Sequence, residues 1–301
     1  MKLLISSIFA LIFFAMPEFA RKAGSQAQKP LFTFGVIADV QYCDCEPAGS
    51  RYYRMSLSKL RESMNSLKED SVDFLINLGD LIDRDYSSFK PALDIIDSSG
   101  IKTWHLTGNH DYSVDPRLKK RLPLPMPSKE GYYSFIHKNF RFITLNGNEI
   151  STYGPGSKSQ LTEAEKYLTA LRDSGSINAM DWNGGMSAKQ LGWLTLQLEE
   201  AVAKGEKVFI LCHFPIYPEN VHNLLNSDDV IEILNKYDNI IAWFNGHNHS
   251  GNYGNFNMIH CVTFRGMVET ETTGSFALVE VYRNKIWIKG SGREKSQILA
   301  Y

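Results

Sequence analysis

The sequence predicts an α/β domain with a mixed or doubled sheet, and three observations support this fold class. First, short apolar runs rich in β-branched and aromatic residues, typical of buried strands, each end abruptly at polar residues. Second, segments with apolar residues at helical spacing lie between these runs. Third, helical patterns stop after residue 255, and the segments that follow are strand-like.

Five runs are predicted to form buried strands. They are LFTFGVIA at 31–38, VDFLINLG at 72–79, IKTWHLTG at 101–108, KVFILC at 207–212 and IIAWFNG at 240–246. The residues that directly follow them are Asp39, Asp80, Asn109, His213 and His247. In α/β domains, functional sites form beyond the carboxyl ends of strands, so these five polar residues are candidates for one shared site.

Two segments between the strands have clear helical patterns. Residues 56–70 carry apolar residues at the spacing of one helix face, namely Leu57, Leu60, Met64 and Leu67. Residues 187–204 open with Ser187 and Gln190, the pattern of a capping box, and continue with apolar residues at helical spacing.

A third helix and the end of the chain follow from the same kinds of signal. Thr162 with Glu165 predicts another helix start by the capping rule. The tail is predicted to close the fold with antiparallel strands, FNMIHCVTF at 256–264, SFALVEVY at 275–282 and KIWIKG at 285–290.

Composition and charge exclude two broad classes of protein. The chain has 301 residues, of which 43% are hydrophobic and 22% charged, and its formal net charge is −1. This hydrophobic content is that of a globular protein rather than a disordered one, and the charge indicates no nucleic-acid partner. The length permits one large domain or two small ones.

The N-terminus has the pattern of an export signal. One lysine precedes a strongly apolar run, and Ser25-Gln26-Ala27 has the small residues that signal peptidases prefer. We therefore predict a signal peptide over residues 1–27 and a periplasmic or secreted mature protein. The alternative is an uncleaved membrane anchor, which Arg21 and Lys22 directly after the run would favour.

The four cysteines carry little functional information. Export would permit disulfides, but Cys43 and Cys45 are expected to be too close for an easy mutual bridge, and they lack zinc-site spacing. Cys212 lies inside an apolar run and is predicted to be a buried small hydrophobe, and Cys261 shows no motif.

The strand ends together carry a set of metal-ligating residue types. The blocks are Asp39-x-Gln41, Gly79-Asp80-x-x-Asp83, Gly108-Asn109-His110-Asp111, His213 and Gly246-His247-Asn248-His249. Each block alone is weak evidence, because a lone Gly-Asp is usually a turn. Together, carboxylate, amide oxygen and imidazole suit divalent manganese, iron or zinc, and the glycines allow sharp turns that bring the side chains together.

In this order the blocks resemble the calcineurin-like metallophosphoesterase superfamily. The resemblance implies a four-layer α/β/β/α sandwich of two mixed sheets, forming a single domain over residues 28–301 that holds two divalent metal ions. It implies that Asp80 bridges both metals. Asp39, Gln41 and His249 would complete one site, and Asn109, His213 and His247 the other.

The same resemblance implies roles for three residues that bind no metal. His110 would protonate the leaving-group oxygen, and Asp83 would orient His110 and favour its protonated form. Arg84 could contact phosphate, although an exposed arginine at a turn is the alternative. A purple acid phosphatase is disfavoured, because its tyrosine ligand is absent and Asp83 occupies that place.

Several loops narrow the resemblance to the manganese-dependent ADP-ribose/CDP-alcohol diphosphatase group. They are FGVIADVQY, RYYRMSL, WNGGMSAKQLGWL, HFPIYPEN, FNGHNHSGNY and VET. That group also has glutamine two residues after the first aspartate. The resemblance implies in-line attack of a metal-bridging hydroxide on a phosphoanhydride bond, giving a nucleoside monophosphate and a phosphorylated sugar or alcohol. The metals would be manganese, with iron or zinc as alternatives.

Candidate substrate-binding residues follow from position alone. Tyr42 could stack on a base, or pack on the sheet edge. Arg51 and Arg54, which flank Tyr52 and Tyr53, could neutralise a diphosphate, or be solvated at a helix start. Asn183 and Gly184 could supply backbone donors to phosphate, or only make the turn into the following helix.

Three other functions remain open at this stage. The chain could be a phosphomonoesterase or a cyclic or linear phosphodiesterase of the same fold, or a non-catalytic protein that binds nucleotides or glycans. The expected partner is a small nucleotide, with no nucleic acid and no stable membrane partner unless the signal segment is retained.

Overall fold

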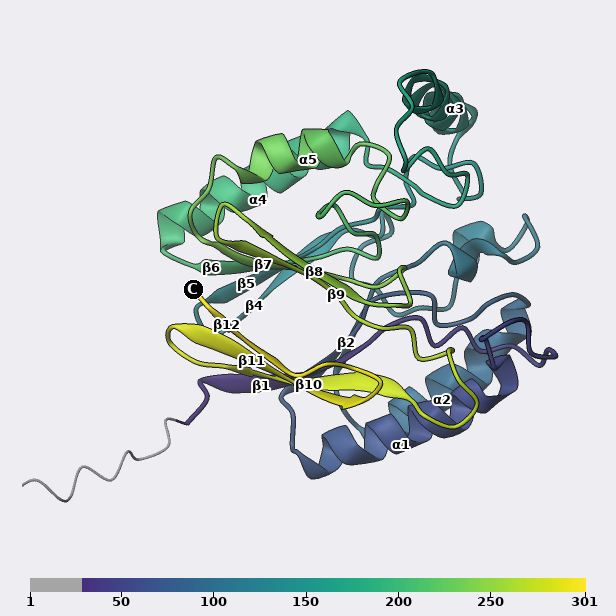
Figure 1. The fold of residues 1–301 in the computed structure, drawn as a ribbon, viewed down its shortest axis with the longest axis vertical. Coiled ribbons are helices and arrows are strands. Elements are labelled where there is room, and N and C mark those ends of the chain that lie inside the picture. The colour runs from purple at the N-terminus through teal and green to yellow at the C-terminus, as the bar shows by residue number, and fades with distance from the viewer. Residues whose placement is uncertain (1–28) are drawn as a thin grey trace, which may run out of the picture.

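The computed structural model describes residues 29–301, and two six-stranded sheets packed face to face form the centre of this part of the chain (Figure 1). The first sheet contains β1 (Phe32–Ile37), β2 (Phe74–Asn77), β3 (Thr103–His105), β10 (Ser275–Val281), β11 (Lys285–Gly292) and β12 (Gln297–Ala300). Its strand order is β12-β11-β10-β1-β2-β3. Strands β1, β2 and β3 run parallel, and the others are antiparallel.

The second sheet has the order β4-β5-β6-β7-β9-β8. Its strands are β4 (Tyr133–His137), β5 (Phe140–Thr144), β6 (Lys207–Leu211), β7 (Ile240–Asn245), β8 (Asn252–Phe256) and β9 (Ile259–Thr263). Strands β5, β6, β7 and β9 are parallel to one another. Both sheets are therefore mixed, as predicted.

Helices cover the outer face of each sheet. Helices α1 (Ser56–Glu69) and α2 (Phe89–Ser99) lie on the first sheet, and α4 (Ala188–Lys204) and α5 (Ser227–Leu234) lie on the second (Figure 1). Helix α3 (Lys158–Asp173) stands apart from these layers (Figure 1). The four-layer α/β/β/α sandwich is confirmed.

Phenylalanine rings fill the space between the sheets. Phe34 stacks on Phe74 with ring centroids 5.2 Å apart, and Phe142 stacks on Phe209 at 5.0 Å. Each fully buried ring contributes roughly 1.5–3 kcal/mol through its removal from water. This dense layer fixes the two sheets relative to each other, and with them the strand ends where the polar residues lie.

The predicted helices agree with the structure except in their capping. Helix α1 buries Leu60, Met64 and Leu67, as its apolar spacing indicates. Helix α4 is capped by Ser187, whose side chain accepts the Gln190 N–H, but the Gln190 side chain does not complete a capping box. It turns inward instead, toward the Asn146 carbonyl at 3.0 Å.

The predicted start of α3 is wrong by one helical turn. The helix begins at Lys158, capped by Ser157, and Ser157 with Gln160 makes the complete capping box. Thr162 and Glu165 lie inside this helix. The same four-residue pattern occurs twice in close succession. Only in the first copy does the leading residue, Ser157, have the extended conformation of a helix cap.

The closing strands are partly as predicted. Strands β10 and β11 pair antiparallel, but β9 is antiparallel only to β8 and runs parallel to β7. Residues 256–264 are therefore not one strand, because a turn at Asn257 and Met258 separates β8 from β9. The β4–β5 hairpin, β8, β12, α2 and α5 were not predicted.

No helix within residues 29–301 is long and apolar enough to cross a membrane. The predicted signal peptide at 1–27 lies outside the described residues.

Candidate metal centre

The carboxyl ends of β1, β2, β3, β6 and β7 bring seven predicted ligands together. These residues are Asp39, Gln41, Asp80, Asn109, His213, His247 and His249. Ligand atoms of Asp80, His213 and His247 all lie within 4.8 Å of one another. Parallel strands of a sheet deliver their carboxyl ends to one edge, so residues far apart in the chain meet there.

Asp80 lies at the middle of this group. Its Oδ2 is 3.3 Å from His213 Nε2 on one side and 3.1 Å from Gln41 Nε2 on the other. Asp39 Oδ1 is 3.5 Å from His249 Nε2 and 3.9 Å from His213 Nε2. Asp80 is thus the carboxylate that reaches both halves of the group.

Three buried ligand atoms have no hydrogen-bond partner among the described residues. They are Gln41 Oε1, Asn109 Oδ1 and His213 Nε2. A buried polar atom left without a partner costs roughly 1–3 kcal/mol, so such atoms are uncommon in stable proteins. Oxygen and imidazole donors are ligands for divalent metals of the manganese-to-zinc series, so the residues present fit such a centre.

Four of these residues adopt left-handed backbone conformations. Asp39 has φ 51°, Gln41 44°, Asp80 54° and His247 67°. For residues other than glycine this conformation costs on the order of 1–3 kcal/mol and is held only by surrounding structure. These backbone conformations make turns that point the four side chains toward the centre of the group. A strand continued with regular backbone angles would point them elsewhere.

Two glycines make room for the carboxylates. A Cβ on Gly108 would lie 2.0 Å from Asp80 Oδ1, and one on Gly246 would lie 2.6 Å from Asp39 Oδ2. These close approaches explain why glycine precedes Asn109 and His247.

Each imidazole of the group is held through its second ring nitrogen. His213 Nδ1 donates to the Leu78 carbonyl at 2.8 Å, and His247 Nε2 pairs with Asn183 Oδ1 at 2.9 Å. His249 Nδ1 pairs with Glu269 Oε1 at 2.7 Å. Partners of this kind fix the tautomer and direct the other nitrogen toward a metal.

The carboxylates give the centre an affinity for positive charge. Burial alone would lower the pKa of His213, but Asp80 and Asp39 raise it to about 9. Burial likewise opposes protonation of His249, whose pKa Asp39 and Glu269 raise to about 9. A divalent cation would be attracted by the same negative potential, and its binding would displace the protons from His213 and His249.

Asp111 ties two of the ligand loops together. Its carboxylate accepts the backbone N–H groups of Asp80 at 3.0 Å, Leu81 at 2.9 Å and Gly108 at 2.9 Å. Burial and the neighbouring Asp80 charge raise its pKa to about 7. The sequence placed Asp111 in the Asn-His-Asp block, but nothing there indicated this positioning role.

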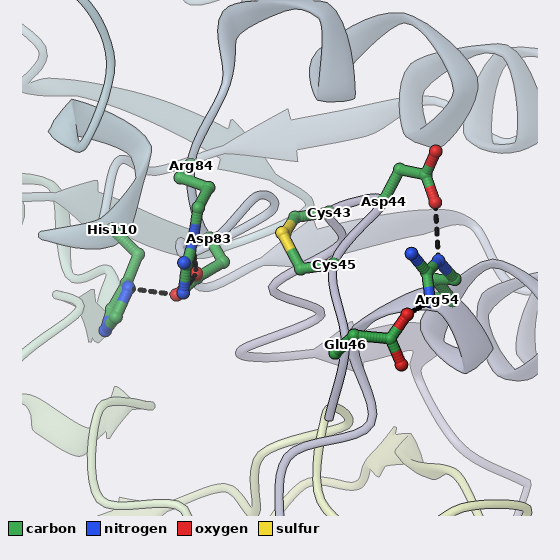
Figure 2. The surroundings of a disulfide bond; sticks show 8 residues. All are labelled: Cys43, Asp44, Cys45, Glu46, Arg54, Asp83, Arg84 and His110. Carbon is green, nitrogen blue, oxygen red and sulfur yellow. Dashed lines mark hydrogen bonds and ion pairs between the residues drawn. A yellow bond between two sulfur atoms is a disulfide. The ribbon is translucent and has the colours of Figure 1, made fainter. Parts of the chain in front are cut away.

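His110, Asp83 and Arg84 form a chain of contacts beside the centre (Figure 2). His110 Nδ1 is 2.6 Å from Asp83 Oδ1, and the Arg84 guanidinium is 2.5 Å from Asp83 Oδ2. Burial lowers the pKa of His110, but Asp80 and Asp83 outweigh it and hold that pKa above its ordinary value. The geometry agrees with the prediction that Asp83 orients His110.

A cleft of about 350 Å³ opens over these residues. It is lined by Gln41, Arg51, Asp80, Asn109, His110, Trp182, His222, His247 and His249. Sequence reasoning assigned no role to Trp182, His222 or Glu269. The only signal was indirect, since Trp182 and Glu269 lie in loops that carry the family resemblance.

Two of the arginines predicted to bind phosphate are placed elsewhere. Arg54 pairs with Asp44 at 2.5 Å and Glu46 at 2.6 Å, away from the cleft (Figure 2). The Arg84 guanidinium holds Asp83 and lies over the Tyr53 ring. Both predictions are corrected, because local carboxylates engage the two guanidinium groups outside the cleft lining.

Tyr42, Asn183 and Gly184, the other three predicted substrate contacts, do not line the cleft and make protein contacts in this structure. Tyr42 packs against the hydrophobic cluster between the first sheet and its helices, as its alternative reading proposed. Asn183 uses its side chain to hold His247. Gly184 approaches the Gly147 carbonyl so closely that a Cβ would lie 2.2 Å from it, so it serves chain packing.

A disulfide joins Cys43 and Cys45, which corrects the expectation that they are too close to bridge (Figure 2). Their Cα atoms are 5.3 Å apart, within the range that disulfides span, and the chain bends at Asp44 between them. Cys212 is buried and free, as predicted, and so is Cys261.

Comparison with known proteins identifies relatives that match most of the chain. Residues 32–251 match the model of the calcineurin-like phosphoesterase family. A manganese-dependent ADP-ribose/CDP-alcohol diphosphatase of Oryza sativa is 32% identical, covering 89% of this chain and 94% of that protein. The Homo sapiens protein of the same name is 30% identical over 93% and 96% of the two chains. The crystal structure of a dimetal phosphatase from Danio rerio superposes with a TM-score of 0.81 at 26% identity, covering 91% of this chain.

Proposed function

The chain belongs to the calcineurin-like phosphoesterase family, and we propose that it hydrolyses the phosphoanhydride bond of ADP-ribose- and CDP-alcohol-type compounds. It is a metal-dependent hydrolase of this family. The products would be a nucleoside monophosphate and a phosphorylated sugar or alcohol. The observation that carries the proposal is Gln41 inside a seven-residue ligand group, in a chain about one-third identical to diphosphatases along most of its length.

We assign the ligands to two manganese ions as follows. Asp80 would bind both, because its Oδ2 lies between the two halves, 3.3 Å from His213 Nε2 and 3.1 Å from Gln41 Nε2. Asp39, Gln41 and His249 would hold one ion, and Asn109, His213 and His247 the other. When bound, two such cations supply an activated water and neutralise negative charge that develops on the phosphoryl oxygens.

His110 is assigned the proton transfer to the leaving oxygen. Its ring lines the cleft, its Nδ1 is held by Asp83, and its Nε2 is therefore the atom that faces substrate. A proton held at this atom would pass to the oxygen that departs from phosphorus. Asp83, buried and held in turn by Arg84, keeps the ring in this orientation.

Product analysis tests the proposal directly. Purified protein loaded with Mn²⁺ is incubated with ADP-ribose or CDP-choline, and products are separated by chromatography. Release of AMP or CMP without inorganic phosphate is the expected result. Inorganic phosphate as the first product would indicate a phosphomonoesterase, and no turnover with any divalent metal would indicate a binding protein.

Replacing Gln41 with histidine is expected to change metal preference. An amide oxygen is a neutral, weaker ligand than imidazole, so Gln41→His should tighten the site with Asp39 and His249 and favour zinc over manganese. Competition between Mn²⁺ and Zn²⁺, followed by elemental analysis of the protein, measures the shift. Unchanged affinity and preference would mean that Gln41 is outside the coordination sphere.

Replacing Asp83 with asparagine is expected to move the pH profile. Asp83 helps to keep the pKa of His110 above its ordinary value, and a general acid works only while protonated. The alkaline limb of kcat, where His110 loses its proton, should therefore shift to lower pH in Asp83→Asn. Rates measured between pH 6 and 10 in both proteins check this. An alkaline limb that does not move would show that Asp83 does not set the protonation of His110.

We also propose that the chain is exported after cleavage beyond Ala27. The Cys43–Cys45 disulfide supports this, because disulfides persist in oxidising compartments and are rare in reducing ones. N-terminal sequencing of the mature protein should begin at Gln28. A protein that keeps residues 1–27 would instead favour the membrane anchor.

A further inference from the structure

We propose that Trp182 is the surface on which the nucleobase of the substrate stacks. This inference deepens the proposed function and rests on it. Trp182 lines the same cleft as the ligand group, from the loop between α3 and α4. Stacking on Trp182 would favour substrates that carry a nucleobase over diphosphates that lack one, whichever base they carry.

Trp182 is the largest aromatic side chain among the residues that line the cleft. Apart from Trp182, these residues have carboxylate, amide, guanidinium and imidazole side chains. The imidazoles of His247 and His249 belong to the ligand group, and Asp83 holds that of His110. The His222 ring is packed edge-on against His247, with centroids 5.2 Å apart. Trp182 is therefore the lining side chain with the largest π-face and no role in the ligand group.

Trp182 is exposed although it is among the most apolar side chains. It is 45% exposed, whereas Trp243 is fully buried. A single exposed apolar side chain is ordinary, but this one lines the cleft, where an aromatic side chain covered by a ligand contributes strongly to binding. A stacked base would cover this surface.

The loop holds Trp182 at a fixed position relative to the metal ligands. The next residue, Asn183, donates to the Asn178 carbonyl at 2.9 Å and to the Val221 carbonyl at 2.8 Å. Its Oδ1 contacts the His247 ring. Asp181, on the other side, pairs with Arg172 of α3. The indole is therefore carried on a segment anchored to the metal centre itself.

Stacking also suits a substrate class with more than one base. Every base has a π-face, so stacking on an aromatic side chain is sequence-tolerant and contributes about 1–3 kcal/mol per base. Adenine and cytosine derivatives would both be accepted. Base identity would then matter less than the diphosphate that all these substrates share.

Kinetics of two Trp182 variants test the inference. Trp182→Ala should raise KM for ADP-ribose and CDP-choline by about 5- to 150-fold, while Trp182→Phe, which keeps a stacking ring, should raise it much less. A dialkyl diphosphate, with the same P–O–P bond and no base, should be hydrolysed equally by all three proteins. Equal losses on nucleotide and base-free substrates would overturn the inference.

A binding measurement separates this inference from the proposed function. Titration of the Mn²⁺-loaded protein with AMP should quench tryptophan fluorescence, and Trp182→Ala should lose that quenching and bind AMP more weakly. Quenching that persists in Trp182→Ala would show that the base does not stack on Trp182, even if ADP-ribose is hydrolysed. If quenching depends on Trp182 but ADP-ribose releases no AMP, the proposed reaction is wrong and the stacking of the base on Trp182 still holds.

Discussion

Asp80→Ala is expected to abolish hydrolysis and empty both metal positions at once. Asp80 is fully buried, and its carboxylate lies within reach of ligands from both halves of the centre. It also accepts the backbone N–H of His110 at 2.8 Å, so the same residue holds the loop that carries the general acid. Removing it should lower kcat/KM by more than about 10³-fold, since the charge stabilisation lost amounts to several kcal/mol.

Initial rates and the metal content of each protein check this result together. Asp94→Ala is the matched control, because Asp94 is an exposed carboxylate on α2 that pairs with the exposed Lys90. That variant should keep wild-type rate and metal content. Two tightly bound metals per chain in Asp80→Ala, or a rate within tenfold of wild type, would contradict the bridging assignment.

His110→Ala is expected to slow turnover while both metals remain bound. Its imidazole lines the cleft, and its ring nitrogen Nδ1 is paired with Asp83, which is not one of the seven predicted ligands. Loss of a positioned general acid lowers rates on the order of 10²–10⁴-fold. The loss should appear in kcat, because the ring acts on the departing oxygen rather than on substrate binding.

Metal analysis distinguishes this result from a structural defect. His137→Ala serves as the control, since His137 lies on β4 and packs against Phe32 and Phe74, far from the cleft lining. It should retain wild-type turnover. If His110→Ala lost its metals, His110 would have to be reassigned as a ligand, and if it kept full activity, the general acid would lie elsewhere.

Much of the centre could be predicted because local pattern determines it. A run such as 240–246 is apolar on both faces and ends at a glycine, so its strand and the polar residue after it follow from adjacent residues alone. The order of five such blocks in one chain identified the resemblance to the family, and this resemblance implied the sandwich of two sheets.

The errors and omissions share a different cause. Thr162 resembled a helix start because capping patterns are four residues long and recur by chance. Glu269 was missed because its function depends on contact with His249, twenty residues earlier on another loop. Neither partner carries a local signal of the other.

The sequence by itself determined the five strands that end at ligand blocks, the blocks themselves and the chemistry that their residue types permit. Only the tertiary structure decided which other side chains face the cleft. Arg51 lines it, and Arg54, three residues later, turns to Asp44 and Glu46 instead. Side-chain direction in a loop depends on backbone angles and on partners brought from distant segments, and neither is written in the spacing of neighbouring residues.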